Sequence, residues 1–337
     1  MNMKKFYLNE DSIIFRDKFR PLKDKPKNIL DPILTKEKQA ILSIVNRRMN
    51  RNVEFIDKIV FTSTCNFGNC LILINKLIFI CELLGCKKII LNKYIYWFLK
   101  KKIIYKDFNM TIEVDDITKY NKSFLFLGKE IYYNFFYIKP ENRMDVIKKE
   151  ILSNLPKVKT NSNDLYIHFR SGNLFTWGNG KNYSQPPLCF YKFILNNFIF
   201  ERIIIISVDD NNPVINKLIN KYKTIIYKKN SLKNDISFLI NAYNIVGSVS
   251  SLLINSIKIN DNLRFFFEYN NYKMIEKIYH LHFDLYNIPI KFTIFKMESS
   301  YNYKKKMHIW LNNRQQRNLM IRDKCYNKFK IITPKML

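Results

Sequence analysis

The sequence of 337 residues has little glycine, little cysteine and few acidic side chains. Its 6 cysteines are too few for the disulfide framework of a small secreted scaffold, so that class is excluded. The sequence has 57 Lys and Arg residues but 28 Asp and Glu residues, so its net charge is +29. The 7 glycines accompany abundant Lys, Asn, Ile, Tyr and Phe, a pattern that an AT-rich genome imposes. The charge therefore has two interpretations, a solvated surface and a selected polyanionic partner.

Long hydrophobic runs are also absent. The most apolar stretch, Leu71 to Leu84, is interrupted by Asn75, Lys76 and Glu82. It is too short and too polar to span a bilayer, and residues 1–15 lack the apolar stretch of a secretory signal. We therefore expect no transmembrane segment, and either a cytosolic protein or a fragment of a secretory-pathway enzyme.

The motifs of the commonest alternative chemistries are missing. There is no Gly-x-x-x-x-Gly-Lys-Ser/Thr loop, His-Glu-x-x-His helix, Gly-x-Ser-x-Gly elbow or Asp-x-Asp metal motif. Cys65 and Cys70, and then Cys81 and Cys86, repeat a CxxxxC spacing that suggests zinc. However, Cys70 and Cys81 fall on one expected helix, about 16 Å apart. Zinc ligands lie at about 2.3 Å from the metal, so we expect no metal site.

What the sequence does contain is material for two packed cores, with 47% hydrophobic and 15% aromatic residues. From residue 58 the pattern is a strand KIVFTST, a turn CNFGN and an apolar helix CLILINKLIFICELLG, ended by Gly85. A strand KKIIL follows, then short β-like runs at 111–114, 123–127 and 131–138, and a helix at 141–154. This segment predicts a first α/β lobe.

Residues 164–257 alternate strictly between strand and helix patterns. The strands are DLYIHF, RIIIISV, KTIIY and VGS, and the helices are LCFYKFILNNF, NPVINKLINKY, LKNDISFLINAYNI and SSLLINSI. Such alternation predicts a mostly parallel, doubly wound sheet, whose ligands bind at the carboxyl ends of the strands.

These patterns divide the chain into four parts. We predict an N-terminal leader at 1–54, a first lobe at 55–155, a second lobe at 160–290 and a basic C-terminal tail at 291–337. The tail combines lysines and arginines with apolar residues, which favours an amphipathic helix that closes over the first lobe. A patch for nucleic acid or a lipid surface is the alternative.

The sharpest feature is the segment IHFRSGN, residues 167–173, at the end of an apolar strand. Arg170 offers a planar fork of donors, and Ser171 and the Gly172 backbone add more, which suits an anion such as a diphosphate leaving group. The alternative for Arg170 is an ion pair with a core carboxylate. His168 alternates with apolar strand residues, so it is either a half-buried structural histidine or a catalytic group.

Together with YSQPPLCFY at 183–191, this segment resembles the His-x-Arg-x-Gly-Asp/Asn motif of the fucosyltransferase superfamily, which includes α1,2-, α1,6- and protein O-fucosyltransferases. Three more places resemble that family in the family's order: the Phe67-Gly68-Asn69 turn, residues 203–218 and residues 232–257. The resemblance implies a GT-B-like fold of two Rossmann-like lobes, with the acceptor at the first lobe and the nucleotide-sugar donor at the second. It also implies metal-independent, inverting transfer from GDP-fucose, with no cofactor besides this donor.

The resemblance implies roles for single residues on the donor side. Arg170 would bind the β-phosphate, with Ser171 and Gly172 beside it, and His168 would position the nucleotide or its loop. Asp209 or Asp210 would contact guanine or ribose. A solvent-exposed turn before Asn212-Pro213 is the alternative for these two aspartates.

Ser248, Ser250 and Ser251 would offer hydroxyls and helix N-terminal amides to phosphate, which the helix dipole makes plausible. Ordinary N-capping of the following helix is the alternative. On the acceptor side, Asn69 matches an asparagine that some family members use in place of a strong base, and an N-cap is again the alternative. No general base stands out, and Asp164 and Asp235 are candidates only by elimination.

The sequence therefore predicts an inverting glycosyltransferase that transfers fucose from GDP-fucose to a glycan or protein acceptor. A transferase for another nucleotide sugar is the nearest enzymatic alternative. A second class is a degenerate glycosyltransferase-fold protein that binds an anionic glycan or nucleic acid through its basic surface.

Overall fold

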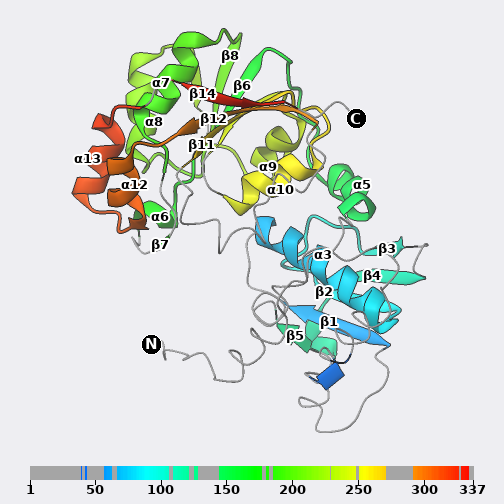
Figure 1. Ribbon diagram of the computed structural model, residues 1–337. Helices are drawn as coiled ribbons and strands as arrows, with labels where there is room; N and C mark the ends of the chain where they lie inside the picture. Colours follow the sequence, from blue (N-terminus) through cyan, green and yellow to red (C-terminus); the bar gives the residue numbers. More distant parts are fainter. Residues whose placement is uncertain are drawn as a thin grey trace. The chain divides into compact units, whose positions relative to one another are not determined.

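The computed structural model consists of two compact units, Met1–Asn154 and Leu155–Leu337. Each contains a mostly parallel sheet with helices (Figure 1), so the predicted fold class of two Rossmann-like α/β lobes is confirmed. The structure describes residues 39, 42–43, 57–62, 67–105, 109–120, 125–127, 144–176, 180–181, 185–227, 229–247, 250–270, 291–325 and 328–333. The predicted leader lies almost entirely outside these residues.

The first unit has a five-stranded sheet in the order β3-β4-β2-β1-β5. The β3 and β4 strands pair antiparallel, and the other neighbouring pairs are parallel. The strands are β1 (Lys58–Thr62), β2 (Lys88–Asn92), β3 (Lys102–Tyr105), β4 (Met110–Asp115) and β5 (Leu125–Leu127). The sequence patterns predicted all of these except β3, because its apolar run is short.

The helix α3 (Phe67–Leu84) is the main helix of this unit. It is followed by Gly85, whose φ of 67° is the left-handed conformation that commonly ends a helix. The helix begins four residues before the apolar stretch 71–84, so the expectation that this segment is too short and too polar to span a bilayer is wrong by length and composition alone: α3 passes that test, and no other described helix does. Within the unit 67% of that stretch is buried, as expected of a core helix.

Two smaller helical elements follow α3 in the described part of the first unit. The 3-10 helix η2 (Ile117–Lys119) is capped by Asp116. The helix α5 (Met144–Asn154) ends where the Asn154 Nδ2 donates to the Phe98 carbonyl at 3.2 Å. The helix predicted at 141–154 is therefore confirmed over its described residues, and the strand predicted at 131–138 lies outside them.

The second unit has a seven-stranded sheet in the order β14-β12-β11-β10-β6-β8-β9. All neighbouring pairs are parallel except β12 with β14. The strands are β6 (Asp164–His168), β8 (Arg202–Ile206), β9 (Ile225–Tyr227), β10 (Asn244–Gly247), β11 (Phe265–Asn270), β12 (Thr293–Glu298) and β14 (Phe329–Ile332).

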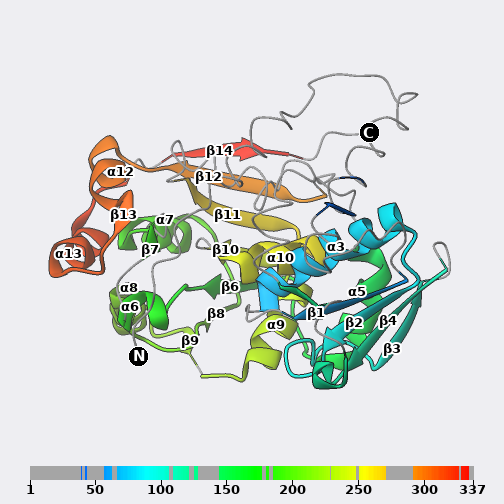
Figure 2. The same ribbon diagram turned by 90° about the horizontal axis from the view of Figure 1, so that it is seen from below.

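Helices cover both faces of this sheet, as Figures 1 and 2 show. One face carries α7 (Leu188–Asn197), α8 (Pro213–Lys221), α12 (Tyr301–Met307) and α13 (Arg314–Arg322). The other face carries α9 (Leu232–Asn241) and α10 (Ser251–Ile259). The short helix α6 (Asn173–Thr176) follows β6, and β7 (Gly180–Lys181) pairs antiparallel with β13 (Ile309–Trp310).

The central strand β6 is buried on both sides because its residues alternate between the two cores. Leu165 and Ile167 belong to the core under α7 and α8, and Tyr166 belongs to the core under α9 and α10. All five residues of the strand are buried. This explains why the strand is a continuous apolar run, as is usual for parallel strands covered on both faces.

Several helix starts follow the capping chemistry of the sequence. Asn212 caps α8 by accepting a hydrogen bond from the Val214 amide at 3.0 Å, and Pro213 occupies the first helical position. Ser231 caps α9 by accepting from the Asn234 amide at 3.3 Å. The α8 start was predicted from Asn212-Pro213, and the α9 helix was predicted without its cap.

The expectation of a helical tail at 291–337 is wrong for much of that segment. The segment contributes β12 and β14 to the seven-stranded sheet, and its helices within residues 291–325 and 328–333 are α12 and α13. The second compact unit accordingly extends beyond residue 290. The physical reason is that the IFKM and FKII runs find strand partners far away in the sequence, which local patterns do not reveal.

Candidate functional site

The candidate site lies where the order of the strands reverses in the second unit. From β6 the chain moves through β8 to β9 on one side and then returns to β10 on the other side. His168 of β6 is in register with Gly247 of β10, so the loops after these two strands leave the same sheet edge next to each other. In open α/β sheets this switch point is the usual ligand crevice.

Arg170 follows β6 at this edge and is half-buried. Its backbone carbonyl accepts a hydrogen bond from the Asn212 Nδ2 at 3.4 Å. Because the Asn212 Oδ1 caps α8, one asparagine both starts that helix and holds the backbone of Arg170. The sequence predicted Asn212 only as part of a helix start, since the long-range contact leaves no local signal.

Asp209 joins the turn after β8 to the turn after β6. Its Oδ1 accepts hydrogen bonds from the Ser171 hydroxyl, from the Gly172 amide at 3.2 Å and from the Asn211 amide at 3.0 Å. Burial raises the pKa of Asp209, but the hydrogen bonds from Ser171, Asn211 and Gly172 outweigh burial and hold the pKa below its usual value. The ionised carboxylate thus fixes the shape of the turn that carries Arg170.

Gly172 is required by the geometry of this turn. Its φ of 64° lies in the left-handed region, where a side chain is strained. A Cβ at this position would also lie 3.0 Å from the Val208 Cγ1. The glycine therefore lets the turns after β6 and β8 approach each other closely.

His168 is 4% exposed at the end of β6. Burial and, to a lesser extent, the nearby positive charge of Arg170 lower its pKa to about 3. The imidazole is therefore neutral at physiological pH. It is suited to position its neighbours by hydrogen bonding, and it does not supply positive charge to a phosphate.

The N-terminus of α10 stands on the β10 side of the same edge. Ser250 precedes the helix, is 2% exposed and makes no side-chain capping bond. Its buried hydroxyl has no hydrogen-bond partner among the described residues. Ser251 is the first helical residue, and Ser248 lies outside the described residues.

Gly247 allows α10 to pack tightly beside this edge. A Cβ at Gly247 would lie 2.1 Å from the Leu253 Cδ2 and 3.0 Å from the Phe266 Cε2. Leu253 is 1% exposed and belongs to the core under α9 and α10. The missing side chain therefore sets how close the amides at the start of α10 come to the strand end.

Acidic groups gather at the ends of β8 and β9. Burial raises the pKa of Tyr227, and the charges of Asp210, Asp209 and Asp235 raise it further, which places these carboxylates around the end of β9. Asp210 is exposed. Asp235 in the first turn of α9 is 7% exposed, and burial raises its pKa to about 6 although a hydrogen bond from Asn230 opposes the shift.

The edge is therefore electrostatically divided. On the β6 and β10 side it has Arg170 and the positive end of the α10 dipole. On the β8 and β9 side it has Asp209, Asp210 and Asp235. Such an arrangement suits a ligand with a strongly anionic group at one end and hydrogen-bond donors at the other.

Comparisons with known proteins add little to this geometry. No protein-family model matches the chain, and no curated protein sequence matches it. A solved structure described as "E. coli heptosyltransferase WaaC with ADP" matches with a TM-score of 0.38 and 9% sequence identity. The match covers 78% of this chain and 96% of that chain. A match with so low a TM-score and identity shows neither the family nor the activity of this chain.

Asp164 does not belong to the candidate site, so its place among the general-base candidates is wrong. It lies at the start of β6, at the other end of the strand from His168, and is completely buried. Its Oδ1 and Oδ2 accept hydrogen bonds from the Arg202 Nε at 2.8 Å and the Arg202 terminal nitrogen at 2.5 Å. The carboxylate is held in a structural ion pair.

Asn69 belongs to the first unit and lies inside the first turn of α3, because the helix begins at Phe67. The predicted turn CNFGN is thus partly helical, and an N-cap role for Asn69 is excluded by its position within the helix. Asn69 is half-buried. Its role toward an acceptor stays a prediction.

Within the described residues no group of three or more His, Cys, Asp or Glu side chains is arranged to hold a metal ion. The helix α3 does carry both Cys70 and Cys81, as the sequence predicted. Cys65 lies outside the described residues. The structure also contains a disulfide between Cys189 and Cys325 that the sequence patterns did not predict.

Proposed function

We propose that this protein is a glycosyltransferase that binds a nucleotide-sugar donor at the switch point of its second unit. The observation that carries the proposal is the juxtaposition of the Arg170 turn with the N-terminus of α10 at Ser250. A buried serine hydroxyl and helix N-terminal amides are donors suited to phosphate. The diphosphate would lie between the ends of β6 and β10.

The proposed reaction needs stabilisation of a leaving group. The acceptor hydroxyl oxygen bonds to the anomeric carbon and releases its proton to solvent, while the bond from that carbon to the β-phosphate oxygen breaks, with inversion, and the nucleoside diphosphate leaves. Negative charge grows on the phosphate in the transition state, so a preorganised guanidinium and helix dipole stabilise the transition state more than the bound donor. Arg170 and the start of α10 would supply this stabilisation without a metal-dependent step.

The acidic side of the edge supports an orientation of the donor. Carboxylates accept hydrogen bonds from ribose hydroxyls and from the N–H groups of a base, and they repel phosphate. Asp210 and Asp235 would therefore contact the nucleoside. Asp209 would act mainly by shaping the Arg170 turn, because its Oδ1 already accepts bonds from Ser171 and Gly172.

GDP-fucose is the donor that the sequence favours, through the resemblance of the IHFRSGN segment to the fucosyltransferase motif. The acceptor would be a glycan or protein hydroxyl, with Asn69 on the acceptor side. A donor with another base or sugar would use the same diphosphate contacts, so the donor identity is tested by comparing nucleotides.

The test is calorimetric titration of GDP, UDP and ADP into the wild-type protein and into Arg170 variants. A hydrogen bond to a charged group is worth about 1.5–3 kcal/mol. Arg170→Ala should therefore lower the affinity for the preferred nucleotide about ten- to a hundredfold. Arg170→Lys keeps the charge but loses the planar fork, so its nucleotide affinity should lie between those of the wild type and Arg170→Ala. Arg314→Ala removes an exposed arginine of α13 and should leave the affinity unchanged.

A melting curve for each variant separates binding from folding. Unchanged nucleotide affinity in a folded Arg170→Ala protein would refute the donor site. A collapsed melting temperature for Arg170→Ala would instead show that the arginine is a structural ion-pair partner. No saturable binding of any nucleotide, together with a steep salt dependence of oligonucleotide binding, would favour the non-catalytic basic protein.

A further inference from the structure

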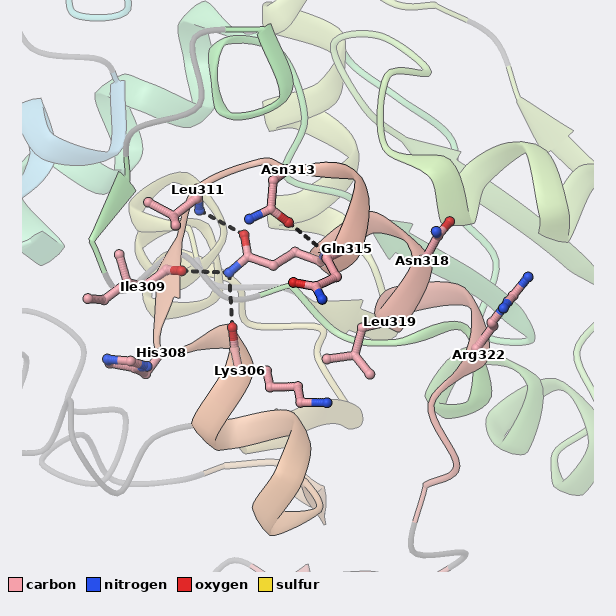
Figure 3. Close-up of a pocket in the computed structure, with 10 residues that line it drawn as sticks. Lys306, His308, Ile309, Leu311, Asn313, Gln315, Asn318, Leu319 and Arg322 are labelled. Carbon is pink, nitrogen blue, oxygen red and sulfur yellow. Dashed lines mark hydrogen bonds between the residues drawn. The ribbon is translucent and has the colours of Figure 1, made fainter.

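A pocket lies in the second unit and has no lining residue in common with the candidate site around Arg170. It has a volume of about 550 Å³ and is formed by α12, β13, α13 and the residues that connect them. Figure 3 shows the side chains around it. The pocket lining includes Lys306, Ile309, Leu311, Gln316, Leu319 and Arg322.

The walls of this pocket are anchored to the core. The completely buried Trp310 of β13 donates from its Nε1 to the Leu174 carbonyl at 2.9 Å. The Phe175 carbonyl accepts from the Asn312 Nδ2 and from an Arg317 terminal nitrogen, each at 2.7 Å. The α12-β13-α13 segment is thus tied to α6, and the pocket is a preformed feature.

Gln316 organises the floor of the pocket. It is 6% exposed. Its Nε2 donates to the Lys306 carbonyl at 3.0 Å and to the Ile309 carbonyl at 2.6 Å, and its Oε1 accepts from the Leu311 amide at 2.8 Å. These three bonds, drawn in Figure 3, hold the end of α12, β13 and the start of α13 in one arrangement.

Most of the pocket surface is apolar, although the lining also includes the exposed polar side chains of His308, Asn313, Gln315 and Asn318. Ile309 is 39% exposed and Leu311 is 53% exposed, and Leu319 of α13 is half-buried beside them. Exposed large side chains are common singly, but a cluster that lines a concave pocket is not expected without a ligand. The lining predicts an apolar portion in whatever binds here.

The charges around this apolar surface are positive. Lys306 and Arg322 are both exposed, and Figure 3 shows them on either side of Leu319. The nearest acidic residues along the chain point elsewhere. Glu298 pairs with Lys304 at 3.2 Å. The Oδ2 of Asp323 is buried, and burial raises the pKa of this carboxyl group.

We propose that this pocket binds an amphipathic anion, a molecule with a hydrocarbon chain and a phosphate or carboxylate head. The chain would lie on Ile309, Leu311 and Leu319, and the head between Lys306 and Arg322. Guanidinium and ammonium groups with no acidic partner in the lining are complementary to such a head. The site uses none of the groups proposed to bind the donor.

Two sources share this chemistry, a dissolved single-chain amphiphile and a lipid presented by a membrane. The first arm of the test is calorimetric titration of dodecyl phosphate below its micellar concentration, with inorganic phosphate as the headgroup alone. The second arm is cosedimentation with vesicles of phosphatidylglycerol, compared with vesicles of phosphatidylcholine. We expect saturable binding of dodecyl phosphate that inorganic phosphate does not match, and binding to the anionic vesicles if the source is a membrane.

Variants test the two halves of the site separately. Leu311→Ser changes no charge and should weaken dodecyl phosphate about five- to tenfold, since it removes apolar contact. The double variant Lys306→Gln/Arg322→Gln should lower the affinity for dodecyl phosphate more than tenfold. The matched control is Lys328→Gln with Lys330→Gln, which removes the same charge from exposed residues that do not line the pocket.

The outcome is read from differences between these proteins. Selective losses in Leu311→Ser and in the Lys306/Arg322 variant support the pocket. Equal losses in the control variant would show diffuse electrostatic attraction and overturn the proposal. Failure of both dodecyl phosphate and phosphatidylglycerol vesicles to bind the wild-type protein would also overturn it.

Discussion

At the scale of single residues, burial moves the pKa values of two groups at the candidate site in opposite directions. Burial disfavours the charged form of any group. It therefore lowers the pKa of His168 to about 3 and raises the pKa of Asp235 to about 6. Both shifts couple the stability of the fold to pH, and each has its own sign.

For His168 the folded pKa lies below the unfolded value of about 6.5. The unfolded chain binds the proton first as the pH falls, so the contribution of His168 is present above pH 6.5 and is lost toward pH 3. His168→Gln cannot titrate. The wild-type advantage in unfolding free energy over this variant should shrink by roughly 1.4 kcal/mol per pH unit between about pH 6 and pH 4.

Urea unfolding of both proteins at several pH values measures this difference directly. The lost contacts of His168 lower the stability of the variant at every pH, so only the change with pH is informative. Parallel stability curves for the two proteins over this range would show that His168 is protonated in the native state.

The contribution of Asp235 to stability changes with pH in the opposite direction, because its folded pKa is raised above the unfolded value. Its favourable contribution is present below about pH 3.8 and is lost as the pH rises through 6. Asp235→Asn removes the buried charge. We expect this variant to gain up to about 3 kcal/mol over wild type at pH 7.5 and to lose this gain at pH 4.

Thermal melts at the two pH values check this prediction, with Asp210→Asn as a matched control because Asp210 is exposed. Destabilisation of Asp235→Asn at pH 7.5 would indicate that the ionised carboxylate is compensated in the fold. A loss of nucleotide affinity in the stabilised Asp235→Asn protein would add support for its proposed contact with the nucleoside.

At the scale of elements, the packing of α10 against β10 determines where the helix N-terminus lies. Gly247→Ala would place a Cβ 2.1 Å from the Leu253 Cδ2. Overpacking of a core site costs about 1–3 kcal/mol, and the shifted helix should also weaken nucleotide binding. Leu253→Ala in the same chain opens space for the new methyl group.

The pair therefore forms a double-mutant cycle. We expect the double variant to be more stable than the sum of the two single effects predicts, and to recover part of the nucleotide affinity lost in Gly247→Ala. Additive losses in stability would show that Leu253 does not limit the approach of α10. Urea unfolding and calorimetry on the four proteins give both quantities.

At the scale of the whole molecule, one covalent link joins distant parts of the second unit. Cys189 in α7 and Cys325 after α13 are bonded across a sequence separation of 136 residues. Closing so long a loop restricts the unfolded chain, and by the loop-entropy relation this stabilises the fold by about 5 kcal/mol. Cys325→Ser should lose this stabilisation under non-reducing conditions.

A reductant supplies the matched comparison. Dithiothreitol should lower the melting temperature of wild type toward that of Cys325→Ser and leave the variant unchanged. A wild-type melting temperature that does not respond to dithiothreitol under unfolding conditions would show that the bond contributes nothing to stability. The disulfide also holds the end of α13 near α7. Titration of dodecyl phosphate into the reduced protein therefore tests whether the pocket beside α13 depends on this bond.

Local signals in the sequence were enough to predict several helices and strands. Apolar runs and their spacing predicted β6, α7 and β8, and Asn212-Pro213 marked the start of α8, because capping and periodicity act within a few residues. The position of Arg170 at a strand end also followed from the sequence alone. These local rules were sufficient for the α/β fold class.

Only the tertiary structure decided the features that join distant segments. The pairing of β12 with β11 and β14, the bond of Ser171 to Asp209 and the Cys189–Cys325 disulfide each connect residues far apart in the chain. The ion pair between Asp164 and Arg202 is likewise visible only in the structure, and it shows that Asp164 has a structural role. Such contacts form only when folding brings complementary groups together, so no pattern within a window of sequence specifies them.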